Sequence, residues 1–203
     1  MMYVMSSGEE RAWEILRSLQ PAVVCRNASV LFEENTVSYI VKSFCYDFSV
    51  CPARKNLKGV NPSAQYLIDR YGYFCIHSCL WYLVHAKDIP LSNRLVKPVN
   101  LRGGELFFRG SHTLPLDGLA MRYGDDKDAF LQKGKDLSAE PLTHGDASLR
   151  LFPMPRIPVD IILWQKDDEF PARADLLLDA TCDIHLPLDI IWSIAMMSIL
   201  VMI

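Results

Sequence analysis

The alternation of apolar and polar residues is clearest in the last third of the chain. Residues 146–152, 158–165 and 174–179 are short segments, rich in Leu, Ile and Val, and turn residues separate them, which is typical of β-strands. Within the middle segment, residues 161–164 are apolar without interruption. Such a run indicates a central strand that is covered on both faces of its sheet.

Apolar residues at helical spacing predict three shorter helices elsewhere. Residues 8–20 carry them behind Ser6 or Ser7, either of which can cap the first turn. Residues 116–123 and 126–133 are predicted to be short helices separated by Gly124-Asp125, and the second of these begins with an acidic residue, which suits a helix N-terminus. The helix over residues 8–20 is predicted to be amphipathic.

The longest predicted helix opens at Asn61 and Pro62 and runs to about Ala86. Asn is a favoured N-cap residue, and Pro is favoured in the first turn because its missing N–H has no helical partner there. Most of the circumference of this helix is apolar or weakly polar, although Gly72 weakens it near the middle. We therefore expect it to be the central helix of the core.

The first half of the chain also contains strand patterns. Residues 28–32 and 36–44 read as two strands around a turn, residues 46–50 can extend their sheet, and residues 106–108 form a short apolar strand candidate. Strands before and after the helices, with short connections, predict an α+β fold. We expect a single domain over residues 1–203, with a largely antiparallel sheet, a long central helix and an apolar C-terminal helix.

The C-terminal segment from Ile190 to Ile203 is apolar all round apart from two serines. Its fourteen residues are fewer than the roughly twenty that cross a bilayer, so we predict a buried helix. The alternative is a helix that dips into a membrane or binds a partner protein, because an apolar helix outside its own core must be covered by something else.

Composition and charge exclude some functions. The formal net charge is -3, and acidic and basic residues are mixed along the chain, so there is no basic stripe to neutralise nucleic-acid phosphates. The N-terminal residues lack the basic flank and apolar run of a secretory signal. We therefore predict a cytoplasmic protein without a nucleic-acid partner, in which the six cysteines stay reduced.

Four of the cysteines are candidate metal ligands. Cys75 and Cys79 are one helical turn apart on the long predicted helix, and Cys45 and Cys51 can complete a four-thiolate set. The spacing inside a helix is unusual for zinc or iron-sulfur sites, however, and the neighbouring residues are apolar. The alternative is that Cys75 and Cys79 are buried free thiols in the core.

Four carboxylates form a second candidate site. Asp167, Asp168 and Glu169 follow the end of a predicted strand, and Asp179 ends the next one. If they meet, they can bind a divalent cation or act in general acid-base chemistry. The alternative is a hairpin turn whose acidic side chains lie in solvent.

Several separated motifs resemble one known family. They are Gly145-Asp146-Ala147, Pro153, Pro155-Arg156, Pro158, Trp164, Asp167, Glu169-Phe170-Pro171, Leu177, Asp179 and His185-Leu186-Pro187, together with looser matches upstream. The pattern resembles the prokaryotic family named domain of unknown function 3786. The resemblance implies a protein of anaerobic bacteria and archaea, some of whose relatives are joined to an iron-sulfur module like that of corrinoid proteins. This chain lacks the closely spaced four-cysteine run of that fused form.

The resemblance and the motifs lead to three functional hypotheses. The first is an accessory or binding protein that works with a protein partner in corrinoid or iron-sulfur redox systems of anaerobes. The second is a metal-assisted enzyme that uses the carboxylate group described above. The third is an interaction subunit that docks through the apolar C-terminal helix.

Overall fold

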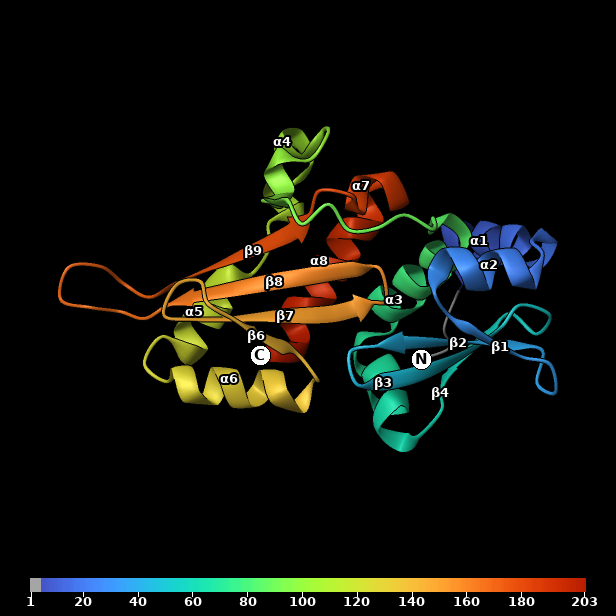
Figure 1. Ribbon diagram of the computed structural model, residues 1–203, viewed down its shortest axis with the longest axis horizontal. Coiled ribbons are helices and arrows are strands. Elements are labelled where there is room, and N and C mark those ends of the chain that lie inside the picture. The colour runs from blue at the N-terminus through green and yellow to red at the C-terminus, as the bar shows by residue number, and fades with distance from the viewer. Residues whose placement is uncertain (1–4) are drawn as a thin grey trace.

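The computed structural model describes residues 5–203, and its strands form two antiparallel sheets (Figure 1). The first half contains α1 (Ser7–Ser18), α2 (Pro21–Ala28), β1 (Leu31–Glu33), β2 (Ser38–Ser43), β3 (Tyr46–Cys51), β4 (Asn56–Gly59) and α3 (Pro62–His85). The second half begins with β5 (Leu95–Val96), η1 (Pro98–Asn100), α4 (Gly104–Phe107), η2 (Gly110–His112), α5 (Leu116–Tyr123) and α6 (Lys127–Asp136). It ends with β6 (Glu140–Leu142), β7 (Ala147–Met154), β8 (Ile157–Trp164), β9 (Arg173–Asp179), α7 (Cys182–His185) and α8 (Leu188–Met202).

The smaller sheet has the strand order β1-β2-β3-β4 and the larger one has the order β5-β9-β8-β7-β6. Every pairing of neighbouring strands is antiparallel. The predicted α+β class is therefore confirmed, although the strands divide between two sheets where we expected one. In β8 every residue except Trp164 is buried, which confirms the prediction of a covered central strand.

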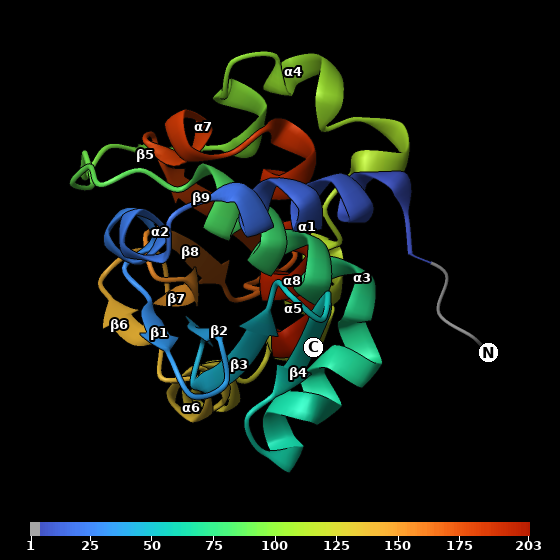
Figure 2. The same cartoon turned by 90° about the vertical axis from the view of Figure 1, so that its right-hand side faces the viewer.

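The long helix α3 runs along one side of the molecule in Figure 2, and the two sheets contact each other directly through β2 and β7. The Asn61 side chain accepts a hydrogen bond from Ala64 N, and Pro62 is the first helical residue, as predicted. α3 packs against β3 and β4 and against α8, and α1 also packs on it (Figure 2). At Tyr71 the backbone leaves helical geometry (φ -123°, ψ 27°), next to Gly72, where the sequence weakens the helix.

The C-terminal helix α8 packs into the core, which confirms the prediction of a buried helix. Ten of its residues are buried in the core, whereas Trp192, Met196 and Leu200 follow one side of the helix and are only half-buried. Tyr71 and Tyr123 hold its last turn, since their hydroxyls donate to the carbonyls of Leu200 and Met202. In residues 5–203 no helix is both long and apolar enough to cross a membrane. The surface that the docking hypothesis needs is therefore already covered by this chain itself.

Some predicted elements are wrong. Residues 28–32 do not form one strand, because Pro21 starts a second helix, α2, which runs to Ala28 and ends at Ser29 in the left-handed conformation (φ 53°). Residues 106–108 are not a strand either, because the chain turns into the short helix α4 after Gly103 (φ 79°). The segment after Cys51, for which no strand was predicted, contains the edge strand β4.

Backbone and tyrosine hydrogen bonds join the two halves of the molecule. Phe44 N, at the end of β2, donates to Phe152 O of β7 at 2.7 Å. The Tyr82 hydroxyl of α3 donates to Ala28 O at 2.6 Å and accepts from Arg156 N at 3.1 Å. The turn between β7 and β8 is therefore fixed to α2 and α3.

His185 lies next to this junction and is buried, with 3% of its surface exposed. Its Nδ1 accepts a hydrogen bond from Lys87 N at 3.1 Å, so the imidazole is neutral with its proton on Nε2. Burial lowers the pKa of His185 from its ordinary value of 6.5, and the positive charges of Arg156 and Lys87 lower it further, whereas Asp179 acts in the opposite direction.

We expect the protein to lose stability as the pH falls below 6.5, because the unfolded chain then protonates this imidazole more readily than the folded chain does. Above that pH the imidazole is neutral in both states and the penalty is absent. Thermal midpoints measured from about pH 7.5 to about pH 5.5 should fall less steeply in His185→Asn, whose amide oxygen can still accept from Lys87 N. Burial also lowers the pKa of His85, which leaves a smaller residual slope. Equal slopes in the two proteins would contradict the prediction.

Candidate functional site

The four candidate thiols do not lie together. Cys75 and Cys79 are buried on α3, and the Cys75 thiol donates to Leu67 O and contacts the Met197 sulfur at 3.5 Å. Cys45 lies in the turn between β2 and β3, and Cys51 ends β3, where its sulfur lies 3.9 Å from Thr36 O.

Burial raises the pKa of Cys75 to about 12 and also raises that of Cys79. Protonated thiols in apolar surroundings are poor metal ligands, so these two fit the buried-thiol alternative. Among the residues that the structure describes, no three His, Cys, Asp or Glu side chains are grouped so as to hold a metal ion.

The four candidate carboxylates are also separated. Asp167, Asp168 and Glu169 lie in the exposed turn between β8 and β9. The Asp167 Oδ1 atom accepts from the backbone N–H groups of Glu169 and Phe170, as a turn-forming Asp does. Asp179 ends β9 at the opposite end of the strand, about 20 Å away for a seven-residue strand. The arrangement favours the solvated-turn alternative and does not favour a shared catalytic centre.

Asp179 instead holds the chain around it. Its Oδ1 atom accepts from the N–H and hydroxyl groups of both Ser92 and Thr181, and its Oδ2 atom accepts from Asn93 N at 2.7 Å. Burial by itself raises the pKa of this carboxyl, but the hydrogen bonds from Thr181 and Ser92 outweigh it and lower the pKa overall. The side chain is fully engaged in a structural role.

The largest cavity described lies beside the turn that joins β8 and β9, which extends away from the body of the molecule (Figure 1). It has a volume of about 570 Å³. We call it the hairpin cavity, and its lining residues are Asp146, Trp164, Gln165, Asp167, Phe170, Pro171 and Arg173. Two aromatic rings and three charged groups therefore meet there.

The floor of the hairpin cavity is built by a close approach of three segments. Trp164 and Arg173 are directly opposite each other in the β8–β9 register, and the Arg173 guanidinium carbon lies 4.2 Å from the centre of the Trp164 ring. Gly145 (φ 59°) lets the loop before β7 pass against this ring, since a Cβ atom there would lie 3.3 Å from the Trp164 ring and 2.8 Å from Leu163 O. The Asp146 carboxylate next to it accepts from Gln165 N at 2.8 Å.

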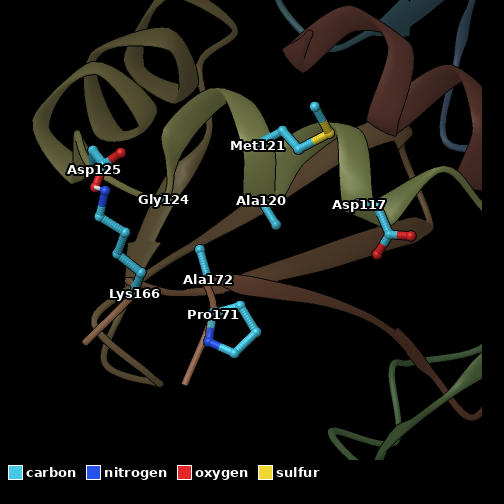
Figure 3. A pocket seen from close by; sticks show the side chains of 8 residues that line it. All are labelled: Asp117, Ala120, Met121, Gly124, Asp125, Lys166, Pro171 and Ala172. Carbon is cyan, nitrogen blue, oxygen red and sulfur yellow. Dashed lines mark ion pairs between the residues drawn. The ribbon is translucent and has the colours of Figure 1, made fainter. Parts of the chain in front are cut away.

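A second cavity of about 420 Å³ lies between α5 and the base of the hairpin (Figure 3). Ala120 faces Pro171 and Ala172 across it, while Asp117 and the ion pair of Lys166 with Asp125 lie towards its two ends. We call it the α5 cavity. Pro171 lines both cavities, so the hairpin is hollowed along more than one side.

Sequence reasoning found part of this site. Asp167 was a candidate from the sequence, and Trp164 and Phe170 were among the family motifs, but none of the three was linked to a cavity. Sequence reasoning missed Arg173, whose position opposite Trp164 depends on the register of the hairpin. The sequence did contain a signal for this pair, because Trp164 and Arg173 flank a single predicted turn, as the two residues of a cross-strand pair do.

The fold and the hairpin cavity define an α+β protein that presents an aromatic, charged hollow on a projecting hairpin. Residues 20–200 match the family described as domain of unknown function (DUF3786), and this match covers nearly the whole chain. The protein therefore belongs to that family, as the motifs indicated. No curated protein and no solved structure matches the chain.

Proposed function

We propose that the protein is a cytoplasmic accessory or binding protein that receives a group of its ligand or partner in the hairpin cavity. The observation that carries the proposal is the cavity itself, which has a volume of about 570 Å³ and aromatic walls. Phe170, on the rim, is 65% exposed. An exposed aromatic side chain on a projecting turn becomes buried when a ligand or partner binds over it, and this burial favours binding.

The partner belongs, in this proposal, to the corrinoid or iron-sulfur redox systems of anaerobic prokaryotes. This part rests on the family setting implied by the sequence motifs. The residues of this chain do not fit a cluster of its own, because Cys75 and Cys79 are buried on α3, whereas Cys45 lies in the β2–β3 turn and Cys51 at the end of β3. We therefore assign the cofactor to the partner and the docking group to this protein.

The test is to purify the protein from its own host without oxygen and to measure the visible absorbance and metal content of what elutes with it. We expect the bands of a corrinoid or an iron-sulfur cluster with the wild-type chain and a large loss of them with Phe170→Ala. Leu106→Ala is the matched control, since Leu106 is also a largely exposed apolar side chain (80%), on α4, outside the hairpin cavity. A colourless, metal-free eluate from both the wild type and the control would overturn the redox assignment.

A further inference from the structure

The Trp164 ring already has a cation over its face. The guanidinium of Arg173 stacks on it at 4.2 Å, which is well inside the range of a cation–π contact. Within the described part of the chain, Arg173 forms no ion pair, and no hydrogen bond of its side chain fixes it elsewhere. The ring is therefore the only group that holds this side chain in place there.

The charges around the ring are predominantly negative. Asp146 uses only Oδ2 to accept from Gln165 N, and Asp167 uses only Oδ1 in the turn, so each has an oxygen without a protein partner among residues 5–203. The adjacent Asp168 and Glu169 carboxylates are exposed, whereas the one nearby lysine, Lys166, is paired with Asp125 at 2.7 Å. The field over the cavity therefore favours a second positive charge.

We infer that the hairpin cavity binds an organic cation, a guanidinium or alkylammonium group, between the Trp164 face and the free oxygens of Asp146 and Asp167. Arg173 then acts as an internal substitute ligand that covers the ring until the external cation displaces it. The aromatic wall and the two half-used carboxylates supply the two interactions that such a cation needs, a ring face and hydrogen-bond acceptors. This inference rests on the proposed function and specifies the chemistry of the group received.

The test uses the purified wild-type protein and the indole N–H resonance of Trp164 in a nitrogen-15 spectrum, assigned by its absence in Trp164→Phe. The probe is Nα-acetyl-arginine amide, and the control is Nα-acetyl-citrulline amide, which has the same length and no charge. We expect the arginine derivative to shift the resonance in a saturable way that weakens with added salt. The citrulline derivative is expected to leave it unchanged.

Two sets of variants are expected to change the affinity in opposite directions. Arg173→Gln should tighten binding of the arginine derivative about two- to fivefold, the factor equivalent to one exposed cation–π contact, because the internal competitor is gone. The double variant Asp146→Asn with Asp167→Asn should weaken it about tenfold or more, although the amide oxygens can still accept the backbone hydrogen bonds that the carboxylates accept. Asp117→Asn, on the α5 cavity, is the control and should change nothing.

Equal shifts with citrulline and arginine, no shift with either, or weaker binding in Arg173→Gln would overturn the inference. The source of the cation is separated by comparing methylguanidinium with a blocked Gly-Gly-Arg-Gly-Gly peptide. Tighter binding of the peptide identifies a basic side chain of a protein partner, and equal binding identifies a free small cation. If all cation binding fails while the hairpin-dependent absorbance bands persist, the inference fails and the proposed accessory function stands.

Discussion

The Asp179→Ala variant is expected to lose about 3–5 kcal/mol of unfolding free energy, among the largest effects of any polar substitution in this protein. The carboxylate accepts five hydrogen bonds, which connect the end of β9 to Ser92, Asn93 and Thr181. Hydrogen bonds to a charged acceptor contribute more than neutral ones, and Thr181 N is buried, so its loss of a partner is not offset by water.

Urea denaturation followed by circular dichroism measures this loss. Asp179→Asn should cost less, about 1–2 kcal/mol, because an amide oxygen can replace Oδ1 while its NH₂ group faces Asn93 N–H without a bond. Asp168→Ala, in the exposed turn, is the control and should stay within about 0.5 kcal/mol of wild type. A loss under about 1 kcal/mol in Asp179→Ala would contradict the structural role assigned to this carboxylate.

The Gly145→Ala variant is expected to be destabilised by about 2–4 kcal/mol, from a left-handed backbone and from overpacking together. The added Cβ would lie 2.7 Å from the Ile162 side chain and 2.8 Å from Leu163 O, where a backbone atom cannot move aside cheaply. Gly110→Ala is the matched control, since Gly110 has nearly the same φ (56°) and nothing within 4 Å of its would-be Cβ.

The control should therefore lose only about 1–2 kcal/mol of unfolding free energy, from the left-handed backbone alone. The difference between the two variants then measures the cost of the steric clash at position 145. Gly145→Ala should also move the Trp164 indole resonance, because the loop that the glycine occupies lies against that ring. Equal stability losses in the two variants would show that the close approach at Gly145 relaxes without cost.

The parts of the fold that the sequence predicts correctly are those with strong local signals. The Asn61–Pro62 start of α3 and the uninterrupted apolar run of β8 each specify an element without knowledge of the rest of the chain. The predictions at residues 28–32 and 106–108 are wrong for the opposite reason. Their apolar residues are few, and the positive φ values at Ser29 and Gly103, which set the local direction of the chain, have no apolar period to reveal them.

The candidate sites show the same limit. Asp167 and Asp179 were grouped because both adjoin strand ends in the sequence. In the structure Asp167 lies in the turn before β9 and Asp179 is the last residue of β9, so the length of this strand separates them. The pairing of Trp164 with Arg173 depends on the register of a single hairpin, and one residue of slip would turn their side chains to opposite faces. Sequence can therefore propose which residues are reactive, whereas the register decides which of them meet.

The packing of α8 against α3 has a kinetic consequence. The hydrogen bond from Tyr71 to Leu200 spans 129 positions of the chain, and the contact of Cys75 with Met197 spans 122. Closing loops of that length loses entropy before the buried surface can compensate, so assembly of this core is expected to be slow on the scale of helical proteins. Until α8 packs against α3, the apolar surface of α3 stays exposed to solvent. The newly synthesised chain is therefore expected to be most prone to aggregation during that interval.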